Sequence, residues 1–114
     1  MEPPLISCDT GEPVLSENSA STDVLKVWQN YPNPFNGSTV IRFELFTDAY
    51  VTVKIYNKPG QVIKTLSDNK LLTTGVYEYY FDGRTISSGR YLFVVSAEIQ
   101  GKKYSQVKEM LLVK

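Results

Sequence analysis

Hydrophobic and polar residues alternate along most of the chain after residue 38. In residues 39–45, the apolar side chains that share one face are Ile41, Phe43 and Leu45. The same alternation returns in residues 51–56, where the inward positions are Val51, Val53 and Ile55. Because successive side chains of a strand point to opposite faces, each segment is predicted to be a half-buried strand.

A turn separates the second of these segments from the next strand. Pro59 followed by Gly60 is typical of a type II turn, in which Gly60 adopts a positive φ. The strand that follows is expected to turn Val62 and Leu66 inward and to end at the polar residues 67–70. The two strands are therefore predicted to form an antiparallel hairpin.

Three further segments complete the strand pattern. Residues 76–81 alternate and are rich in aromatic residues, with an inner face formed by Tyr77, Tyr79 and Phe81. Residues 82–89 are rich in turn formers and long enough to carry the chain to a second sheet. The next strand has an inner face formed by Tyr91, Phe93, Val95, Ala97 and Ile99. Leu92 and Val94 are also apolar, which indicates a central strand or an exposed patch. After a turn at residues 100–102, residues 104–113 supply the closing strand.

The residues before position 38 divide into a polar leader and a segment rich in proline. Residues 1–23 contain many Pro, Ser, Thr and acidic residues, and we expect a flexible linker from an upstream domain. Residues 24–28 are predicted to be a short extended piece at the start of a single domain, 24–114. The proline segment, residues 31–36, contains Pro32 and Pro34, which fix φ and exclude a helix or a central strand. We expect a stiff loop from which Tyr31 and Phe35 project onto the edge of the core.

The strand spacing predicts the fold class. About seven short strands at intervals of roughly ten residues, separated by turn residues, indicate an all-β, immunoglobulin-like β-sandwich of antiparallel strands. The Cys and Trp hallmarks of antibody domains are missing, so a small barrel is the main alternative.

Composition narrows the classes of partner and of chemistry that are open to this chain. Lys plus Arg equals 12 and Asp plus Glu equals 12, so the net charge is zero and we expect no nucleic-acid partner. The sequence has no apolar run long enough to span a bilayer, so we expect no insertion into a membrane. Histidine is absent, which removes the commonest general base and metal ligand. The lone Cys8 cannot form an intrachain disulfide. We expect no catalysis, no cofactor and no metal, and no signal peptide is recognisable at Met1.

Several side chains offer other chemistry. Four tyrosines could form a binding surface if they share one exposed face, namely Tyr50, Tyr56, Tyr80 and Tyr104. Sugar rings could stack on such a surface, and the domain would then be a carbohydrate-binding or protein-binding accessory module. Cross-strand pairing explains these tyrosines equally well. Glu44 and Glu78 could face each other as paired carboxylates, but both alternate with core residues, and they are expected to be solvated since nothing else suggests a cleft. Asp48, Asp68 and Asp82 lack calcium-loop spacing, so turn formation explains them.

A series of motifs, in order along the chain, carries a family resemblance. The motifs are residues 29–36 (QNYPNPFN), 38–43 (STVIRF), 55–57 (IYN) with Gly60, 81–83 (FDG) with Ser88, Gly89 and Tyr91, and finally Lys108 with 110–114 (MLLVK). Together they resemble the type A C-terminal sorting domain of type IX secretion, over residues 27–114. An immunoglobulin-like domain of flagellar hook-capping proteins is related and shares much of the core pattern, which leaves a structural spacer as a third possibility.

The resemblance implies a function and two sets of residues. Family members are the last domain of larger exported proteins of the Bacteroidetes, which pass through the periplasm to the cell surface or the extracellular space. The implied partners are the type IX outer-membrane translocon, a surface sortase and an N-terminal cargo domain. The implied structural residues are Tyr31, Pro32, Asn33, Pro34, Phe35, Asn36, Gly60, Asp82, Gly83, Gly89 and Tyr91. The implied recognition residues are Lys108, Glu109, Met110, Leu111, Leu112, Val113 and Lys114.

Alternatives remain for the recognition residues. The closing strand can dock onto a partner by strand addition or by inserting side chains, or it can simply complete the sandwich. Exposed strands also allow a weak homodimer. Two positions depart from the family pattern: Gly37 stands where proline is common, and Glu109 stands where lysine is preferred. The first loosens a turn, and the second puts one charge contact with the translocon in doubt.

Overall fold

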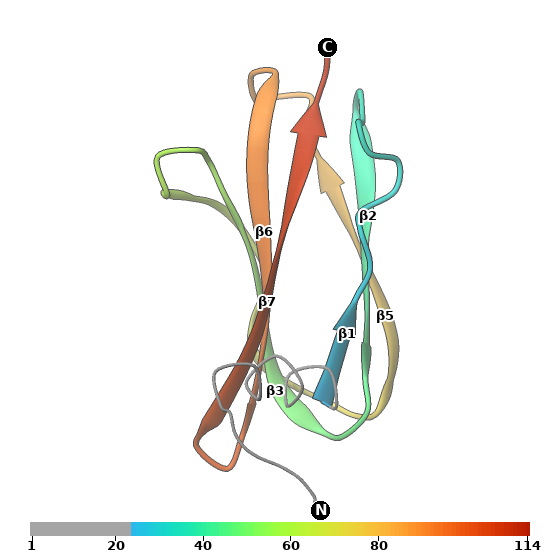
Figure 1. Cartoon of the computed structure of the whole chain (residues 1–114), viewed down its shortest axis with the longest axis vertical. Coiled ribbons are helices and arrows are strands. Elements are labelled where there is room, and N and C mark those ends of the chain that lie inside the picture. The colour runs from blue at the N-terminus through green and yellow to red at the C-terminus, as the bar shows by residue number, and fades with distance from the viewer. Residues whose placement is uncertain (1–23) are drawn as a thin grey trace, which may run out of the picture.

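A computed structural model describes residues 24–114 as two antiparallel sheets packed face to face (Figure 1). The three-stranded sheet has the order β1–β2–β5, with bounds Leu25–Val27, Ser38–Leu45 and Gly75–Asp82. The four-stranded sheet has the order β4–β3–β6–β7, with bounds Val62–Leu72, Ala49–Tyr56, Gly89–Ile99 and Lys102–Leu112. The predicted seven-stranded sandwich is confirmed. The expected linker, residues 1–23 including Cys8, lies outside the described residues.

The core lies between the sheets and is made by the predicted inner faces. Ile41, Phe43 and Leu45 of β2 are fully buried, as are Val51, Val53 and Ile55 of β3. On β6, Phe93, Val95 and Ala97 are also fully buried. Burial of this apolar area is the main stabilising contribution to such a fold.

The aromatic strand β5 covers one side of this core. The Phe43 ring stacks on Tyr77 at 5.5 Å between centroids and lies 5.9 Å from Tyr79. Tyr77 is half-buried, and its hydroxyl donates to the Thr73 carbonyl at 2.7 Å. Its ring is therefore covered while its polar end is satisfied, as is usual for tyrosine at a core edge.

Strand β4 agrees with the prediction at Leu66, which packs against the core, and differs from it at Val62. Val62 is 47% exposed, whereas its neighbour Ile63 packs against the core. The pairing of β3 with β4 contains several register shifts, and each shift changes which side chains point inward. The strand also continues through residues 67–70, because the Ser67 hydroxyl donates to the Val51 carbonyl and the Asn69 amide donates to the Thr52 hydroxyl, at 3.2 and 3.0 Å.

Two hairpin turns depend on positive φ angles. Gly60 has a φ of 99°, as predicted. The hydrogen bond that closes this turn runs from the Gly60 amide to the Asn57 carbonyl at 3.0 Å, one residue earlier than the type II turn expected at residues 58–61. Between β6 and β7, Gln100 and Gly101 have φ angles of 50° and 85°. Positive φ at both residues of a two-residue loop suits the twist of a tight hairpin.

Strand β6 is central and also partly exposed. It pairs with β3 on one side and with β7 on the other. Its outward residue Leu92 is 37% exposed. The central position expected for this doubly apolar strand is therefore confirmed.

Candidate functional site

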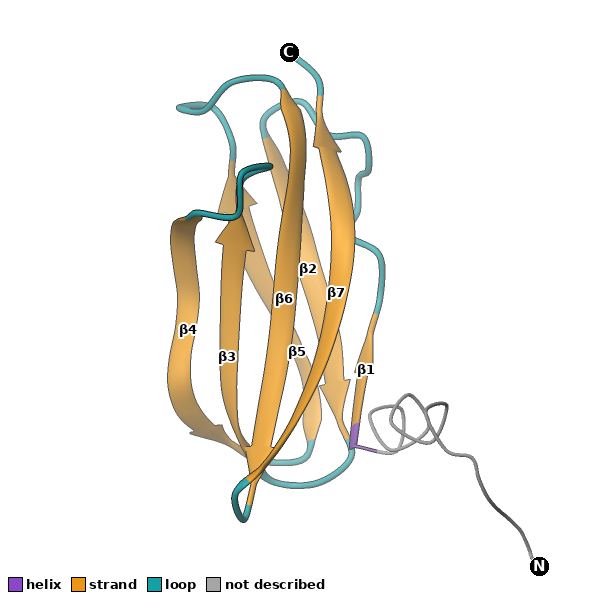
Figure 2. Ribbon diagram, turned by 60° about the vertical axis from the view of Figure 1, so that its left-hand side comes forward, coloured by secondary structure: helices purple, strands orange, loops and turns teal. Residues whose placement is uncertain are grey.

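The proline segment lies along the outer edge of β7, near the end of that strand (Figure 2). The Phe35 amide donates to the Leu111 carbonyl, and the Val113 amide donates to the Phe35 carbonyl, both at 2.9 Å. Phe35 and Leu112 thereby form a parallel bridge. The segment acts as a short additional strand on the edge of the four-stranded sheet.

Side chains close the same edge further. The Asn33 Oδ1 atom accepts the Leu111 amide at 3.0 Å, and the Gln29 side-chain amide donates to the Glu109 carbonyl at 2.6 Å. The outer backbone groups of β7 around residues 109–113 therefore have partners within the chain. Strand addition at this part of the edge would have to displace the proline segment.

A buried polar network fixes the proline segment to β2. The Asn30 side chain donates to the Thr39 hydroxyl at 2.9 Å and to the Pro32 carbonyl at 3.1 Å. The Thr39 hydroxyl donates to the Pro32 carbonyl at 2.8 Å. Asn30 and Thr39 are almost fully buried, so each needs these partners. Sequence reasoning missed both residues, although a polar residue at the inward position 39 was an available signal.

The two aromatic residues of the proline segment point in different directions. Phe35 is 2% exposed and packs edge-on against Phe81, with 6.2 Å between the ring centroids. Tyr31 is 80% exposed, so the prediction that it projects onto the core is wrong. Its backbone pairs with Val40 in an antiparallel bridge, and this pairing turns the ring to the outer face.

Gly83 allows the elements to approach closely here. A Cβ atom at this position would lie 3.0 Å from the Phe35 ring and 3.2 Å from Leu112. The Gly83 amide also donates to the Gly37 carbonyl at 2.7 Å. A side chain at position 83 would therefore force these neighbours apart.

The seven residues that the resemblance implies for recognition, 108–114, divide by burial. Met110 is 0% and Leu112 is 1% exposed, and both belong to the core. The other five present side chains at the surface, with Lys108 and Leu111 half-buried and the remainder exposed, namely Glu109, Val113 and Lys114. Glu109, which stands where the family prefers lysine, forms an ion pair with Arg90 of β6 at 3.5 Å. The acidic side chain at this position therefore has a partner within the chain.

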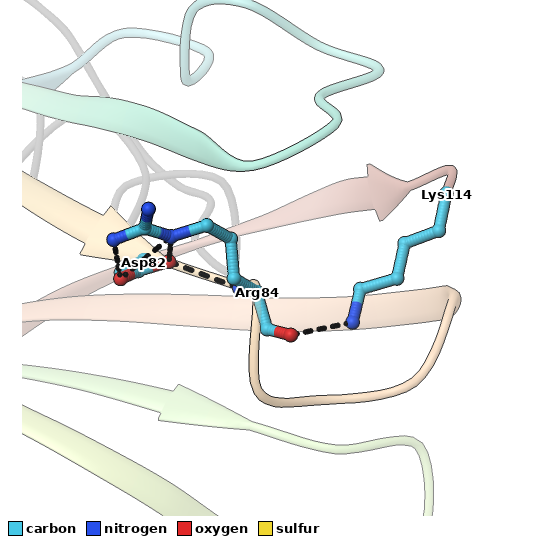
Figure 3. A network of polar contacts seen from close by, with 3 residues as sticks. All are labelled: Asp82, Arg84 and Lys114. Atoms are coloured by element: carbon cyan, nitrogen blue, oxygen red, sulfur yellow. Dashed lines mark hydrogen bonds and ion pairs between the residues drawn. The ribbon is translucent and has the colours of Figure 1, made fainter.

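The loop between β5 and β6 holds Lys114 (Figure 3). The Lys114 ammonium group donates to the Arg84 carbonyl at 2.8 Å, and the Lys114 amide donates to the Ser88 hydroxyl at 3.0 Å. Tyr91 supports the loop through a hydrogen bond from its hydroxyl to the Ser87 carbonyl at 2.7 Å. The proline segment, this loop and the end of β7 thus meet at one end of the sandwich.

Asp82 carries the largest electrostatic effect at this end. The Arg84 side chain, aided by the Arg84 amide, lowers the pKa of Asp82 from 3.8 to about 2. Arg84 Nη2 lies 2.8 Å from the carboxylate. Because the folded pKa is lowered, the stabilising interaction is present above pH 3.8 and is lost as the pH falls through about 2.

We expect an NMR titration of the Asp82 carboxyl carbon to show its midpoint near pH 2. In Arg84→Ala the guanidinium is absent, so the midpoint should return toward 3.8. Arg90→Ala is the matched control, since Arg90 pairs with Glu109 instead. A midpoint that stays unchanged in Arg84→Ala would contradict the assigned cause.

The other sequence candidates do not come together in the combinations considered from the sequence. Tyr80 lies on the three-stranded sheet, whereas Tyr50 and Tyr56 are on β3 and Tyr104 is on β7. These four tyrosines therefore do not share one face. Glu78 lies opposite Arg42, not Glu44. Within residues 24–114 no group of three acidic, His or Cys residues is placed to hold a metal ion, and no helix there is long and apolar enough to cross a membrane.

Comparison with known proteins gives the family. The model of the secretion system C-terminal sorting domain matches residues 29–111. The chain belongs to this family. The matched region spans the proline segment, all strands from β2 to β6, and most of β7.

Two solved structures share the fold of this sorting domain. Dimeric latent PorU from Porphyromonas gingivalis matches with a TM-score of 0.63 and 21% identity, over 95% of this chain and 10% of that one. The endo-β-1,4-mannanase of Thermotoga petrophila matches with a TM-score of 0.54 and 15% identity, over 80% of this chain and 20% of that one. The chain spans a small part of both proteins. No curated protein matches.

The family assignment establishes the general role of the domain. The domain is a sorting signal of type IX secretion, so it works with that machinery and accompanies an N-terminal cargo region. The destination is the cell surface or the extracellular space.

Proposed function

We propose that this sorting domain is a non-catalytic address label for residues N-terminal to it, and that the secretion machinery reads the exposed side chains of residues 108–114. The observation that supports this proposal is the alternation of burial in that segment. Met110 and Leu112 anchor the segment in the core, and between and after them Leu111, Val113 and Lys114 are left at the surface. Because the segment is already held in one conformation, a partner that binds it loses little free energy to ordering the segment.

The proposed partners are an outer-membrane translocon, which reads the segment, and a surface sortase, which acts on the leader. Recognition through side chains fits the closed backbone edge around Phe35 and Leu111 better than strand addition does. The charges at this end are mixed, with Lys108 and Lys114 beside Glu109, so contacts with a partner combine apolar and charged groups.

The test is surface delivery of a reporter in a host with type IX export. A periplasmic reporter fused before residues 1–114 should reach the surface. The variant Leu111→Ser/Val113→Ser/Lys114→Ala should lower surface reporter about tenfold or more, as truncation of central contact residues does at other interfaces. Cell-surface labelling of the reporter measures the effect.

The matched control lies on the same strand and the same outer face. Lys103→Ala/Val107→Ser changes two exposed residues of β7 that precede the segment, and surface reporter should stay within about twofold of the unchanged domain. Thermal melting of each purified variant shows that both remain folded. Normal export of the folded triple variant would exclude the proposed reading.

A further inference from the structure

The outer face of the three-stranded sheet carries two exposed aromatic rings in one row. Tyr31 pairs with Val40 of β2, and Val40 pairs with Tyr80 of β5. Cross-strand partners point to the same face, so the three side chains stand side by side. Tyr31 is 80% and Tyr80 is 74% exposed. We call these three residues the tyrosine row.

The spacing of the strands sets the distance between the two tyrosines of the row. Tyr31 and Tyr80 lie on opposite sides of β2, which places their backbones two strand spacings apart, or about 10 Å. Aromatic rings this exposed to water add little to the stability of the fold. Tyrosine is a common contact residue of binding surfaces.

A second row of polar groups lies beside the first. The Trp28 amide donates to the Arg42 carbonyl at 3.1 Å, and Arg42 lies opposite Glu78. The Arg42 and Glu78 side chains are 3.9 Å apart and each is about half exposed, at 51% and 54%. A loose, solvated pair of this kind leaves donor and acceptor atoms free to bond a ligand.

Trp28 orients this polar row. The Arg42 guanidinium lies 4.6 Å from the Trp28 ring, and the Lys26 ammonium group lies 4.9 Å from it. A cation over an aromatic face is attracted by the ring, which holds Arg42 on the sheet. A hollow of about 370 Å³ lies at the Tyr31 end of the tyrosine row, and Tyr80 stands outside it. It is lined by Trp28, Gln29, Tyr31, Val40, Arg42 and Glu78.

The chemistry of this face indicates the ligand. Exposed rings bind the apolar faces of sugars, while guanidinium, carboxylate and amide groups bond to sugar hydroxyls. The outward charges of this sheet are Lys26 and Arg42 against Glu44, Glu78 and Asp82. Arg84 forms an ion pair with Asp82, so the charges of the face sum to zero and favour a neutral ligand. A proline-rich peptide fits less well, because Arg42 and Lys26 already contact the Trp28 ring that would grip a proline.

We propose that the tyrosine row and the adjoining Arg42–Glu78 pair bind a neutral, extended oligosaccharide. In a β-1,4-linked chain, alternate sugars present the same face, which suits two rings on one face separated by a gap. Tyr31 and Tyr80 stack on two such sugars, and Arg42 and Glu78 bond their hydroxyls. This site is separate from residues 108–114 and does not depend on their proposed role.

Calorimetry with the full chain tests the proposal, using cellohexaose, mannohexaose and xylohexaose as neutral probes. At least one should bind saturably. Tyr80→Ala and Tyr31→Ala should each weaken that binding by about tenfold. This is near the upper end of the loss in affinity expected when one stacking contact is removed. Tyr50→Ala is the matched control, because Tyr50 is an exposed tyrosine on the other sheet.

The remaining measurements separate this ligand from others. Failure of all three neutral probes to bind overturns the proposal, as does binding that Tyr80→Ala leaves unchanged in a variant with a normal melting curve. Tighter binding of an oligogalacturonate or of a decaproline peptide than of any neutral probe also overturns it.

Discussion

Replacing Phe35 with alanine is expected to lower the free energy of unfolding by about 3–5 kcal/mol, the usual cost of removing a buried phenylalanine ring. Phe35 is 2% exposed and packs between the two sheets against Phe81, beside Leu112 and Gly83. Its loss leaves a cavity and also loosens the backbone bridge to β7. Urea unfolding followed by tryptophan fluorescence measures the change, since Trp28 is the only tryptophan.

Tyr31→Ala is the matched control in the same proline segment. Tyr31 is 80% exposed, so its truncation should change the free energy of unfolding by less than about 0.5 kcal/mol. Equal effects of the two substitutions would contradict the division of the segment into a buried anchor and an exposed ring. The pair also shows whether Tyr31→Ala can serve as a folded variant in sugar-binding measurements.

The alternation of residues predicted the sheets wherever strand pairing is regular. Phe43 and Val53 lie inward because the side-chain period of a strand is two and one face of each strand is buried. Val62 was misplaced because bulges in the pairing of β3 with β4 reset the alternation, and the sequence of one strand does not show the register of its pair.

Tyr31 was misplaced for a related reason. Pro32 and Pro34, which follow Tyr31, predict a stiff loop, but the direction of an irregular segment depends on what it pairs with. Pairing with Val40 sends Tyr31 outward, and pairing with Leu112 sends Phe35 inward. Neither partner is close to these residues in the sequence, so local propensity carries no information about them.

The candidate site was predictable as separate motifs and not as an assembly. Family resemblance supplied Gly83, Phe35 and the residues of the closing strand. Their convergence depends on the crossing of the chain between sheets, which brings Gly83 beside Phe35 and Leu112. The buried pair Asn30 and Thr39 has no apolar signature, and its role follows only from the hydrogen bonds to the Pro32 carbonyl.

A residue can be needed for export because it is read or because it holds the reading surface in place, and Met110 separates the two. Its side chain is fully buried, so Met110→Asp should cost about 3–5 kcal/mol by placing an unpaired carboxylate in the core. Met110→Leu preserves volume and polarity and should cost less than about 1.5 kcal/mol. Urea unfolding and surface delivery of the reporter should then change together: both lost in Met110→Asp, and both retained in Met110→Leu. If Met110→Leu kept its stability but lost export, the methionine itself would be recognised, and the division between buried anchors and exposed recognition side chains would be wrong.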